Sequence, residues 1–205
     1  MEKKKMYRKC GKRIIDCTLS IFGLIFLFIP MLIISVAIKL DSKGPVLFKQ
    51  KRLGKNMKVF TVYKFRTMCV NAYEMGGVAT SSNDARITKV GAVLRRTSMD
   101  EFPQLINIIK NEMAIIGPRP ILPVEFEEYK ENKEYYKRFK VLPGLFCTID
   151  IVNRASEREL QFEMDAEYAE KLSFIKDLKA FFGVIKIVVS GENVYHEEVG
   201  NHKKR

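Results

Sequence analysis

The stretch CTLSIFGLIFLFIPMLIISVAI, residues 17–38, decides how this chain is organised. It carries no charge over 22 positions, and about 20 apolar residues are enough for a helix to cross a bilayer. A cleaved signal peptide also follows a basic start, but its apolar region runs roughly 7–15 residues. The length of the run therefore favours a membrane segment that stays in the mature protein.

Basic residues flank this apolar run at both ends. Residues 1–13 carry seven Lys or Arg, and residues 39–66 carry nine. Basic flanks remain on the cytoplasmic side of a membrane, so a spanning helix would satisfy only one of them. Pro30 lies near the middle of the run, where it removes a backbone hydrogen bond and opens the turn. We therefore expect residues 14–40 to form a re-entrant helix hairpin kinked at Pro30, with a spanning helix as the alternative.

The chain as a whole is strongly basic. Its 205 residues include 36 Lys or Arg and 24 Asp or Glu, which gives a formal net charge of +12. This excess favours a polyanionic partner: nucleic acid, anionic lipid or a phosphorylated substrate. Nucleic-acid-binding signatures are absent and the membrane segment argues against that partner, so no nucleic acid is expected. The four cysteines form no CxxC pair, which disfavours a metal cage and indicates reduced thiols.

The rest of the chain predicts an α+β fold that is mostly helical with a small β-hairpin. β-forming residues at 46–50 and 57–68 flank turn residues at 54–56, a pattern typical of a hairpin. Helical patterns follow at residues 86–111, 124–140 and about 165–189. The apolar face of the last helix could line the core or lie in the lipid interface.

Ser98-Met99-Asp100-Glu101 is the first group of residues that could carry chemistry. One interpretation is a capping box, with Ser98 as the N-cap and Glu101 at the third helical position. Pro103 complicates that register, because proline fits best at the first helical position. In either register the helix dipole favours the ionised forms of Asp100 and Glu101. An ionised aspartate there could act as a nucleophile and the glutamate could hold a divalent metal, so both interpretations stay open.

Arginines supply the second group. Arg119 stands between Pro118 and Pro120, which restrict its backbone, and a guanidinium on a stiff turn suits bidentate phosphate binding. The alternative is a loop that ends a helix with the arginine in solvent. Arg95 could likewise neutralise phosphate or decorate a basic helix. We expect the basic residues of the hairpin to face anionic lipid head groups; they are Lys49, Lys51, Arg52, Lys55 and Lys58.

A set of short motifs follows in order along nearly the whole chain. They are KRIID (residues 12–16), GPVLFKQ (44–50), YKFRTM (63–68), ITKVG (87–91), LRRTSMDEFPQL (94–105), IGPRP (116–120), PG (143–144) and FEMD (162–165). Together they resemble the bacterial sugar transferase family, the monotopic polyprenyl-phosphate phosphoglycosyl transferases. The resemblance implies an N-terminal membrane helix at residues 1–40, a cytoplasmic catalytic domain at residues 41–195 and a basic tail at residues 196–205.

The resemblance also implies roles for single residues. Asp100 would be the nucleophile and Glu101 a ligand of Mg²⁺. The phosphate-binding arginines would be Arg119, Arg95 and Arg154, and the further active-site candidates are Asp165 and Lys64. The reaction implied is transfer of a phospho-sugar from a UDP-sugar to undecaprenyl phosphate, through a covalent aspartyl intermediate and with release of UMP. It would take place at the cytoplasmic face of the bacterial inner membrane, as the first membrane step of a surface glycan pathway, and a homodimer is one arrangement left open.

The sequence departs from the family pattern in two places. Ile29, where a serine is usual, precedes Pro30, and residues 145–153 replace the usual Ile-Thr-Gly and Gln-Val-Asn-Gly pattern. The second departure leaves open an unusual donor or an altered activity. A non-catalytic membrane-surface adaptor and a membrane-anchored nucleotide-sugar hydrolase are the competing hypotheses. The joint presence of Asp100, Glu101 and Arg119 argues against the adaptor.

Overall fold

The computed structural model describes residues 6–76, 84–147, 149 and 158–190. Arg154 and the basic tail at residues 196–205 therefore lie outside the described residues. Within the described ranges the fold is mostly helical, with a two-stranded antiparallel sheet and a two-stranded parallel sheet. The expectation of an α+β fold with a long apolar helix near the N-terminus is confirmed.

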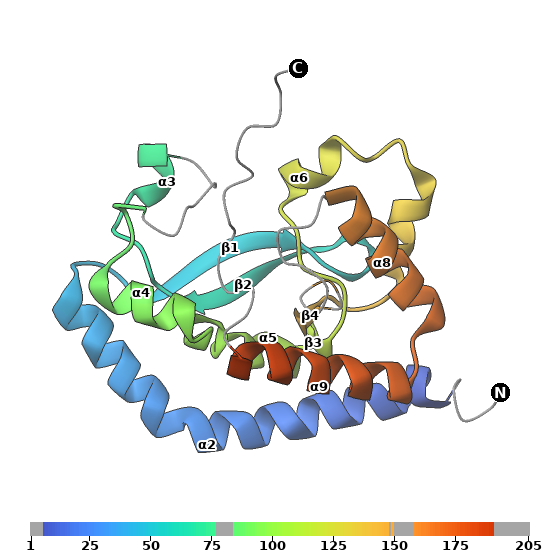
Figure 1. The fold of residues 1–205 in the computed structure, drawn as a ribbon, viewed down its shortest axis with the longest axis horizontal. Coiled ribbons are helices and arrows are strands. Elements are labelled where there is room, and N and C mark those ends of the chain that lie inside the picture. Colours follow the sequence, from blue (N-terminus) through green and yellow to red (C-terminus); the bar gives the residue numbers. More distant parts are fainter. Residues whose placement is uncertain (1–5, 77–83, 148, 150–157, 191–205) are drawn as a thin grey trace.

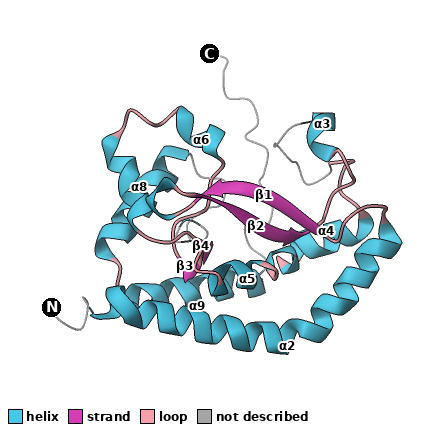
Figure 2. Ribbon diagram, turned by 180° about the vertical axis from the view of Figure 1, so that it is seen from behind, coloured by secondary structure: helices cyan, strands magenta, loops and turns pink. Residues whose placement is uncertain are grey.

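The apolar run forms one long helix, α2 (Lys12–Asp41), which follows a single turn, η1 (Tyr7–Gly11). Figure 1 shows α2 as a curved rod along the lower edge of the molecule, and Figure 2 shows the same edge from behind. The helix continues through Pro30, so the prediction of two helices separated by a break is wrong in that detail. Ser35 Oγ donates to the Met31 carbonyl at 2.6 Å, one turn away from the hydrogen bond that Pro30 removes.

Both ends of α2 are fastened to the rest of the protein. At its start, Lys12 Nζ lies 2.6 Å from Asp177 Oδ2, and the backbone N–H of Ile115 donates to Asp16 at 3.3 Å. At its end, the Val90 N–H donates to the Asp41 carboxylate at 3.0 Å. A helix that crossed a bilayer would place its two ends on opposite sides of the membrane. Both ends of α2 instead contact the same folded domain.

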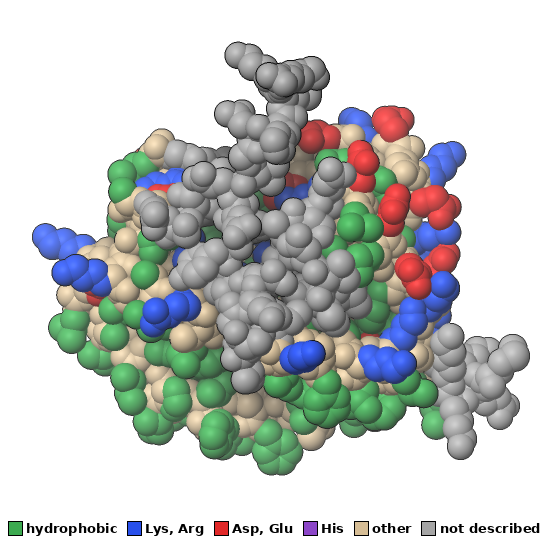
Figure 3. Space-filling view, in the orientation of Figure 1, with side chains coloured by type: hydrophobic (Ala, Val, Ile, Leu, Met, Phe, Trp, Pro, Cys, Tyr) green, Lys and Arg blue, Asp and Glu red, His purple; other side chains and the backbone are tan. Residues whose placement is uncertain are grey.

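The outward face of α2 is apolar and exposed along its length. Phe26 is 83% exposed, and large apolar side chains surround it on the same face, among them Ile14, Leu19, Phe22, Ile25, Phe28, Ile29, Ile33, Val36 and Leu40. A second helix, α9 (Phe174–Ser190), exposes Phe174, Ile175, Leu178, Phe182 and Ile185. Figure 3 shows hydrophobic side chains gathered along this lower edge, with Lys and Arg above them. Such a continuous apolar surface marks a membrane or partner contact.

The β-hairpin is formed by β1 (Leu47–Leu53) and β2 (Val59–Phe65), joined through the short η2 turn (Lys55–Met57). Its register pairs Gln50 with Val62 and Leu47 with Phe65. The predicted hairpin is confirmed to within a few residues. A second sheet, which the sequence did not predict, pairs β3 (Ala114–Ile116) with β4 (Gly144–Phe146) in parallel.

The predicted long helices are interrupted. The segment at 86–111 divides into α4 (Lys89–Arg96), η3 (Met99–Glu101) and α5 (Gln104–Ile109). The segment at 124–140 divides into α6 (Pro123–Glu127) and η4 (Lys133–Lys140), and the last helix follows α8 (Arg158–Lys171). A five-residue helix, α3 (Ala72–Gly76), lies between the hairpin and α4. These interruptions let short elements wrap round the hairpin.

The core joins elements from the whole described chain. Val62 of β2, Ile108 of α5, Ile116 of β3 and Leu172 next to α8 are buried in one apolar cluster. Leu24 and Leu27 of α2 pack against this cluster, so the helix is one wall of the core. α9 buries Ala180 and Val184 while its other face is exposed, so the expectation that the last helix lines the core is confirmed and the lipid-interface alternative stays a prediction.

Candidate active site

A hollow of about 460 Å³, open to solvent, lies over one face of the β-hairpin. Side chains alternate along a strand, so residues two apart share a face. The hairpin contributes Phe48, Gln50 and Arg52 from β1 and Val62 and Lys64 from β2. The alternation places the neighbouring Lys49 and Lys51 on the other face. The expectation that Arg52 joins the lipid-facing lysines is therefore wrong.

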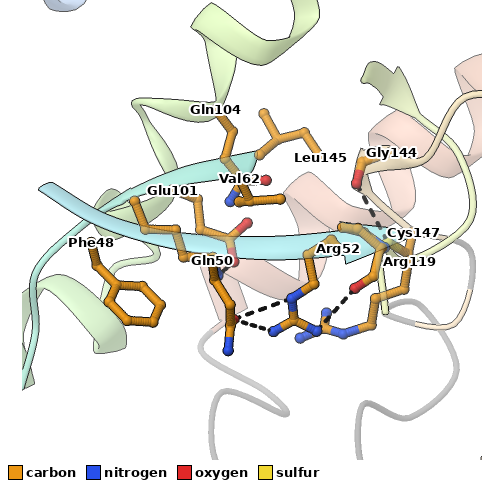
Figure 4. Close-up of a pocket in the computed structure, with 12 residues that line it drawn as sticks. Phe48, Gln50, Arg52, Val62, Glu101, Gln104, Arg119, Gly144, Leu145 and Cys147 are labelled. Carbon is orange, nitrogen blue, oxygen red and sulfur yellow. Dashed lines mark hydrogen bonds and ion pairs between the residues drawn. The ribbon is translucent and has the colours of Figure 1, made fainter. Parts of the chain in front are cut away.

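Three segments complete the walls of this hollow. Glu101 comes from η3 and Gln104 from the start of α5, Arg119 and Pro120 come from the loop after β3, and Gly144, Leu145 and Cys147 come from β4 and its end. Figure 4 shows Glu101 toward one end of the hollow, with Arg52 and Arg119 together at the other. The divergent stretch that begins at Leu145 thus forms part of the wall.

A left-handed residue turns the Asp100-Glu101 pair toward the hollow. Ser98 has φ 55°, which ends α4 and starts η3 in a new direction. Its side chain makes no capping hydrogen bond, so the capping-box interpretation is not realised. Glu101 lines the hollow. Asp100 is not among the lining residues, but its Oδ2 lies 3.9 Å from Nζ of Lys64, which does line the hollow.

Lys64 ties the two carboxylates together. Its Nζ lies 2.6 Å from Glu101 Oε1 and 3.9 Å from Asp100 Oδ2. Burial raises the pKa of Asp100 to about 6, the Lys64 charge opposes the rise, the Glu101 charge adds to it and Arg95 opposes it. Asp100 therefore combines a poorly solvated carboxylate with a nearby ammonium, an arrangement in which it is ionised at neutral pH yet held in few hydrogen bonds. Such a carboxylate is suited to act as a nucleophile.

The predicted arginines occupy different places. Arg119 lines the hollow. Arg95, on α4, donates from Nε to Thr67 Oγ1 at 2.9 Å and acts on Asp100 through its charge, without lining the hollow. Burial lowers the pKa of Arg95 and the Asp100 charge opposes this. Arg154 lies outside the described residues.

Asp165 lies behind the Arg119 loop rather than in the hollow. It is fully buried on α8 and pairs with Arg138 of η4, whose Nη2 lies 2.6 Å from Asp165 Oδ2. The same Nη2 donates to the Arg119 carbonyl at 2.6 Å. Burial raises the pKa of Asp165 to about 6 and Arg138 opposes the rise. Asp165 therefore supports the Arg119 loop through Arg138, and the structure brings the two predicted residues together indirectly.

Gln50 and Arg52 also line the hollow, although they were not among the predicted site residues. Gln50 and Arg52 stand side by side on its floor, with Arg52 Nη2 donating to Gln50 Oε1 at 2.6 Å. A signal for them was present in the sequence, because positions 48, 50 and 52 share one face of a strand that pairs with the Lys64 strand. The neighbouring Lys49 and Lys51 led to the prediction that the whole strand forms one basic surface, so this alternation was missed.

The donor set of the site fits Mg²⁺ only together with a phosphorylated substrate. Among the residues that the structure describes, no three His, Cys, Asp or Glu side chains gather into a metal-binding group. Asp100 and Glu101 offer two neighbouring carboxylates, of which that of Glu101 lines the hollow. Mg²⁺ is commonly bound through one or two carboxylates and completes its shell with water and substrate phosphates.

A cationic hollow beside a poorly solvated aspartate, on a domain edged by an exposed apolar helix, fits the class of membrane-associated proteins that act on anionic substrates. Residues 7–191 match the family model of the bacterial sugar transferases, and the chain belongs to that family. The resemblance described from the motifs is thereby confirmed.

Curated relatives of known name lie within the same family. The chain is 37% identical over 187 residues to the exopolysaccharide production protein PSS of Rhizobium leguminosarum bv. phaseoli, covering 85% of this chain and 92% of that protein. It is 38% identical over 178 residues to the UDP-glucose:undecaprenyl-phosphate glucose-1-phosphate transferase of Escherichia coli K12, covering 83% of this chain and 38% of that protein. It is 36% identical over 171 residues to the UDP-N-acetylgalactosamine-undecaprenyl-phosphate N-acetylgalactosaminephosphotransferase of Aeromonas hydrophila, covering 80% and 40%. The chain thus spans nearly the full length of the first relative and about two fifths of the other two.

Proposed function

We propose that this protein transfers a sugar phosphate from a UDP-sugar to undecaprenyl phosphate at the cytoplasmic face of the bacterial inner membrane. The product is an undecaprenyl-diphosphate-sugar that serves surface polysaccharide synthesis, and UMP is released. The observation that carries the proposal is the position of Asp100 beside Lys64, which lines the hollow together with Glu101 and Arg119. The names of the relatives from Escherichia coli and Aeromonas hydrophila support the substrate classes.

In the first half of the reaction an Asp100 oxygen attacks the phosphorus that carries the sugar. The bond from this phosphorus to the bridging oxygen breaks, and UMP leaves with that oxygen. A phospho-sugar ester of Asp100 remains, so one difficult transfer is divided into two steps. The charge of Lys64 reduces the repulsion between the entering carboxylate and the diphosphate. Arg119 holds a donor phosphate from the opposite end of the hollow.

In the second half an oxygen of the lipid phosphate attacks the same phosphorus. The bond to the Asp100 oxygen breaks, which restores the carboxylate and yields the lipid diphosphate sugar. Glu101 would hold Mg²⁺ together with donor phosphate oxygens, and the ion would neutralise the diphosphate charge.

The exposed apolar face supports the membrane location. With the outward face of α2 and the exposed side chains of α9 in the acyl region, the protein lies on one leaflet and both ends of α2 stay with the domain. This placement is a monotopic one, in agreement with basic flanks on both sides of the apolar run. A lipid phosphate and a water-soluble donor can then meet at the head-group level.

The experiment that tests the proposal is UMP release from a panel of UDP-sugars by the full chain in nanodiscs with Mg²⁺ and undecaprenyl phosphate. Wild type and Asp100→Asn are compared, with Glu127→Gln as a matched acid-to-amide control at an exposed position of α6. The proposal is supported if wild type and the Glu127→Gln control form lipid-linked sugar and Asp100→Asn forms none with any donor. UMP release that exceeds one equivalent per enzyme without the lipid phosphate points to the hydrolase, because the proposed transferase can release only one equivalent before the lipid acts. No release from any donor by folded wild type rejects the transferase and favours the adaptor.

A further inference from the structure

Arg52 faces the hollow from the end of β1 that is remote from Lys64. Phe48 pairs with Lys64 across the hairpin, and Arg52 lies four residues further along the strand. Two hydrogen bonds direct the Arg52 guanidinium back along the strand toward Gln50. Its Nε and Nη2 both donate to Gln50 Oε1, at 3.2 and 2.6 Å. The guanidinium therefore lies near the level of Gln50, two residues or roughly 7 Å along the strand from the level of Lys64. A diphosphate placed between these two levels can contact Lys64 with one phosphate and Arg52 with the other.

The same end of the hollow holds Arg119. The Leu53 N–H donates to the Ile121 carbonyl at 2.9 Å, which joins the end of β1 to the segment that carries Arg119. Arg52 Nη1 also donates to the Pro120 carbonyl at 3.3 Å. Figure 4 shows the Arg52 and Arg119 side chains beside each other. Backbone pairing thus holds two guanidinium groups at one end.

Within the described residues, Glu125 pairs with both Arg52 and Arg158 near this end of the hollow. Glu125 Oε2 lies 3.5 Å from Arg52 Nη1, but it also accepts the Leu122 N–H at 2.7 Å. The other oxygen of Glu125 lies 2.9 Å from Arg158 Nη2. One carboxylate thus serves two guanidinium groups. Burial lowers the pKa of Arg52 to about 10, Glu125 opposes this, and the charges of Arg119 and Arg158 add to it, so Arg52 is still charged at neutral pH.

We infer that Arg52 binds, together with Arg119, the donor phosphate that departs with the nucleoside, while Lys64 faces the phosphate that stays with the sugar. The inference rests on the proposed function. When Asp100 attacks, the bond to the bridging oxygen breaks and negative charge grows on the departing phosphate. Two guanidinium groups that are already in place stabilise that charge and hold the nucleoside monophosphate until it leaves.

Calorimetric titration of the full chain in detergent tests this without any transfer step. The probes are inorganic pyrophosphate, UMP and uridine. We expect Arg52→Gln to weaken pyrophosphate and UMP binding at least tenfold and to leave uridine unchanged. Lys51→Gln is the matched control, since it removes the same charge from the next residue, which is exposed on the other face of β1. Arg52→Lys keeps the charge without the planar fork and is expected to give an intermediate loss, which guards against a folding defect in the glutamine variant.

Equal affinities of Arg52→Gln and Lys51→Gln for pyrophosphate overturn the inference, as does a wild type that binds neither pyrophosphate nor UMP. In the transfer assay, Arg52→Gln with an unchanged KM for the donor overturns it as well and leaves the proposed function standing. A protein that binds pyrophosphate through Arg52 but transfers no sugar phosphate refutes the proposed function alone.

Discussion

Arg138 and Asp165 form an ion pair inside the protein, with 2.6 Å between Nη2 and Oδ2 and side chains that are 1% and 0% exposed. The guanidinium also lies over the ring of Phe162, 4.7 Å from its centroid, and donates to the Arg119 carbonyl. The pair therefore connects the hydrophobic core to the loop that carries Arg119. Its two members are 27 residues apart in the chain, on η4 and α8.

Removing one member of this pair should cost far more than removing both. Arg138→Met leaves a buried carboxylate without its partner, which costs about 3–5 kcal/mol of unfolding free energy. The loss should shrink as the pH falls, because the lone carboxyl then takes up a proton. Arg138→Met combined with Asp165→Leu should recover most of the stability but not the activity, because the Arg119 loop loses its support. Denaturant unfolding and UMP release on the two variants measure this, and a double variant as unstable as the single one would contradict it.

The transfer rate should fall as the pH drops through about 6. Asp100 must be ionised to attack, and burial raises its pKa to about 6 against the opposing charge of Lys64. Lys64→Met removes that opposing charge, so the transfer rate of this variant should begin to fall at a higher pH than that of wild type. This shift of the pH profile is expected in addition to any loss of the maximal rate. Lys49→Met, an exposed lysine on the other face of the hairpin, is the control. The measurement is the initial rate between pH 5 and pH 9. Superimposable normalised profiles would argue against the role of Lys64.

Asp100→Asn should abolish transfer and yet stabilise the fold. The pKa of Asp100 is higher in the folded protein than its ordinary value, so ionisation of this carboxyl costs stability as the pH rises through about 6. A shift of this size corresponds to roughly 2–3 kcal/mol at most, or a few degrees in Tm. The gain should be full at pH 8 and vanish by about pH 4, where the wild-type carboxyl is neutral in both states. Thermal unfolding at the two pH values checks this, with Glu127→Gln showing no gain.

Phe26→Lys should weaken membrane binding and spare the fold. Phe26 is 83% exposed on α2, so its replacement removes little packing, whereas a lysine in the acyl region costs on the order of 2–3 kcal/mol. Val124→Lys places the same charge on α6, at a position that is 67% exposed and far from α2 in Figure 1. Flotation with vesicles of phosphatidylethanolamine and phosphatidylglycerol should show a loss for Phe26→Lys alone. Equal flotation of the two variants would place the membrane contact elsewhere.

Local sequence patterns predicted the elements whose causes are local. The hairpin follows from β-forming residues on both sides of a turn at Gly54, and the strands occur within a few residues of the predicted bounds. The apolar run likewise predicted the long helix, but continuity through Pro30 depends on packing along the domain. The break at Ser98 was missed because apolar spacing continues on both sides of it, and its left-handed φ is set by the surrounding fold.

The site was predictable where a motif brought its residues together. Asp100 and Glu101 are adjacent in the chain, and Arg119 is marked by two prolines. The role of Asp165 was hidden because its partner, Arg138, belongs to another segment. Arg52 was grouped with lysines of similar charge, and only the pairing of β1 with β2 shows that it lies on the same face of the hairpin as Lys64.

The helix that meets the lipid is also a structural wall, because Leu24 and Leu27 pack on the central core and Ile38 is buried against Phe65 and Leu94. It is thus no tether that could be cut to release a soluble enzyme, since its removal would uncover the interior. In the proposed placement, this shared helix would fix the height of Asp100 above the bilayer. The lipid substrate would then reach the enzyme by diffusion in the plane of the membrane, and the donor alone would arrive from solution.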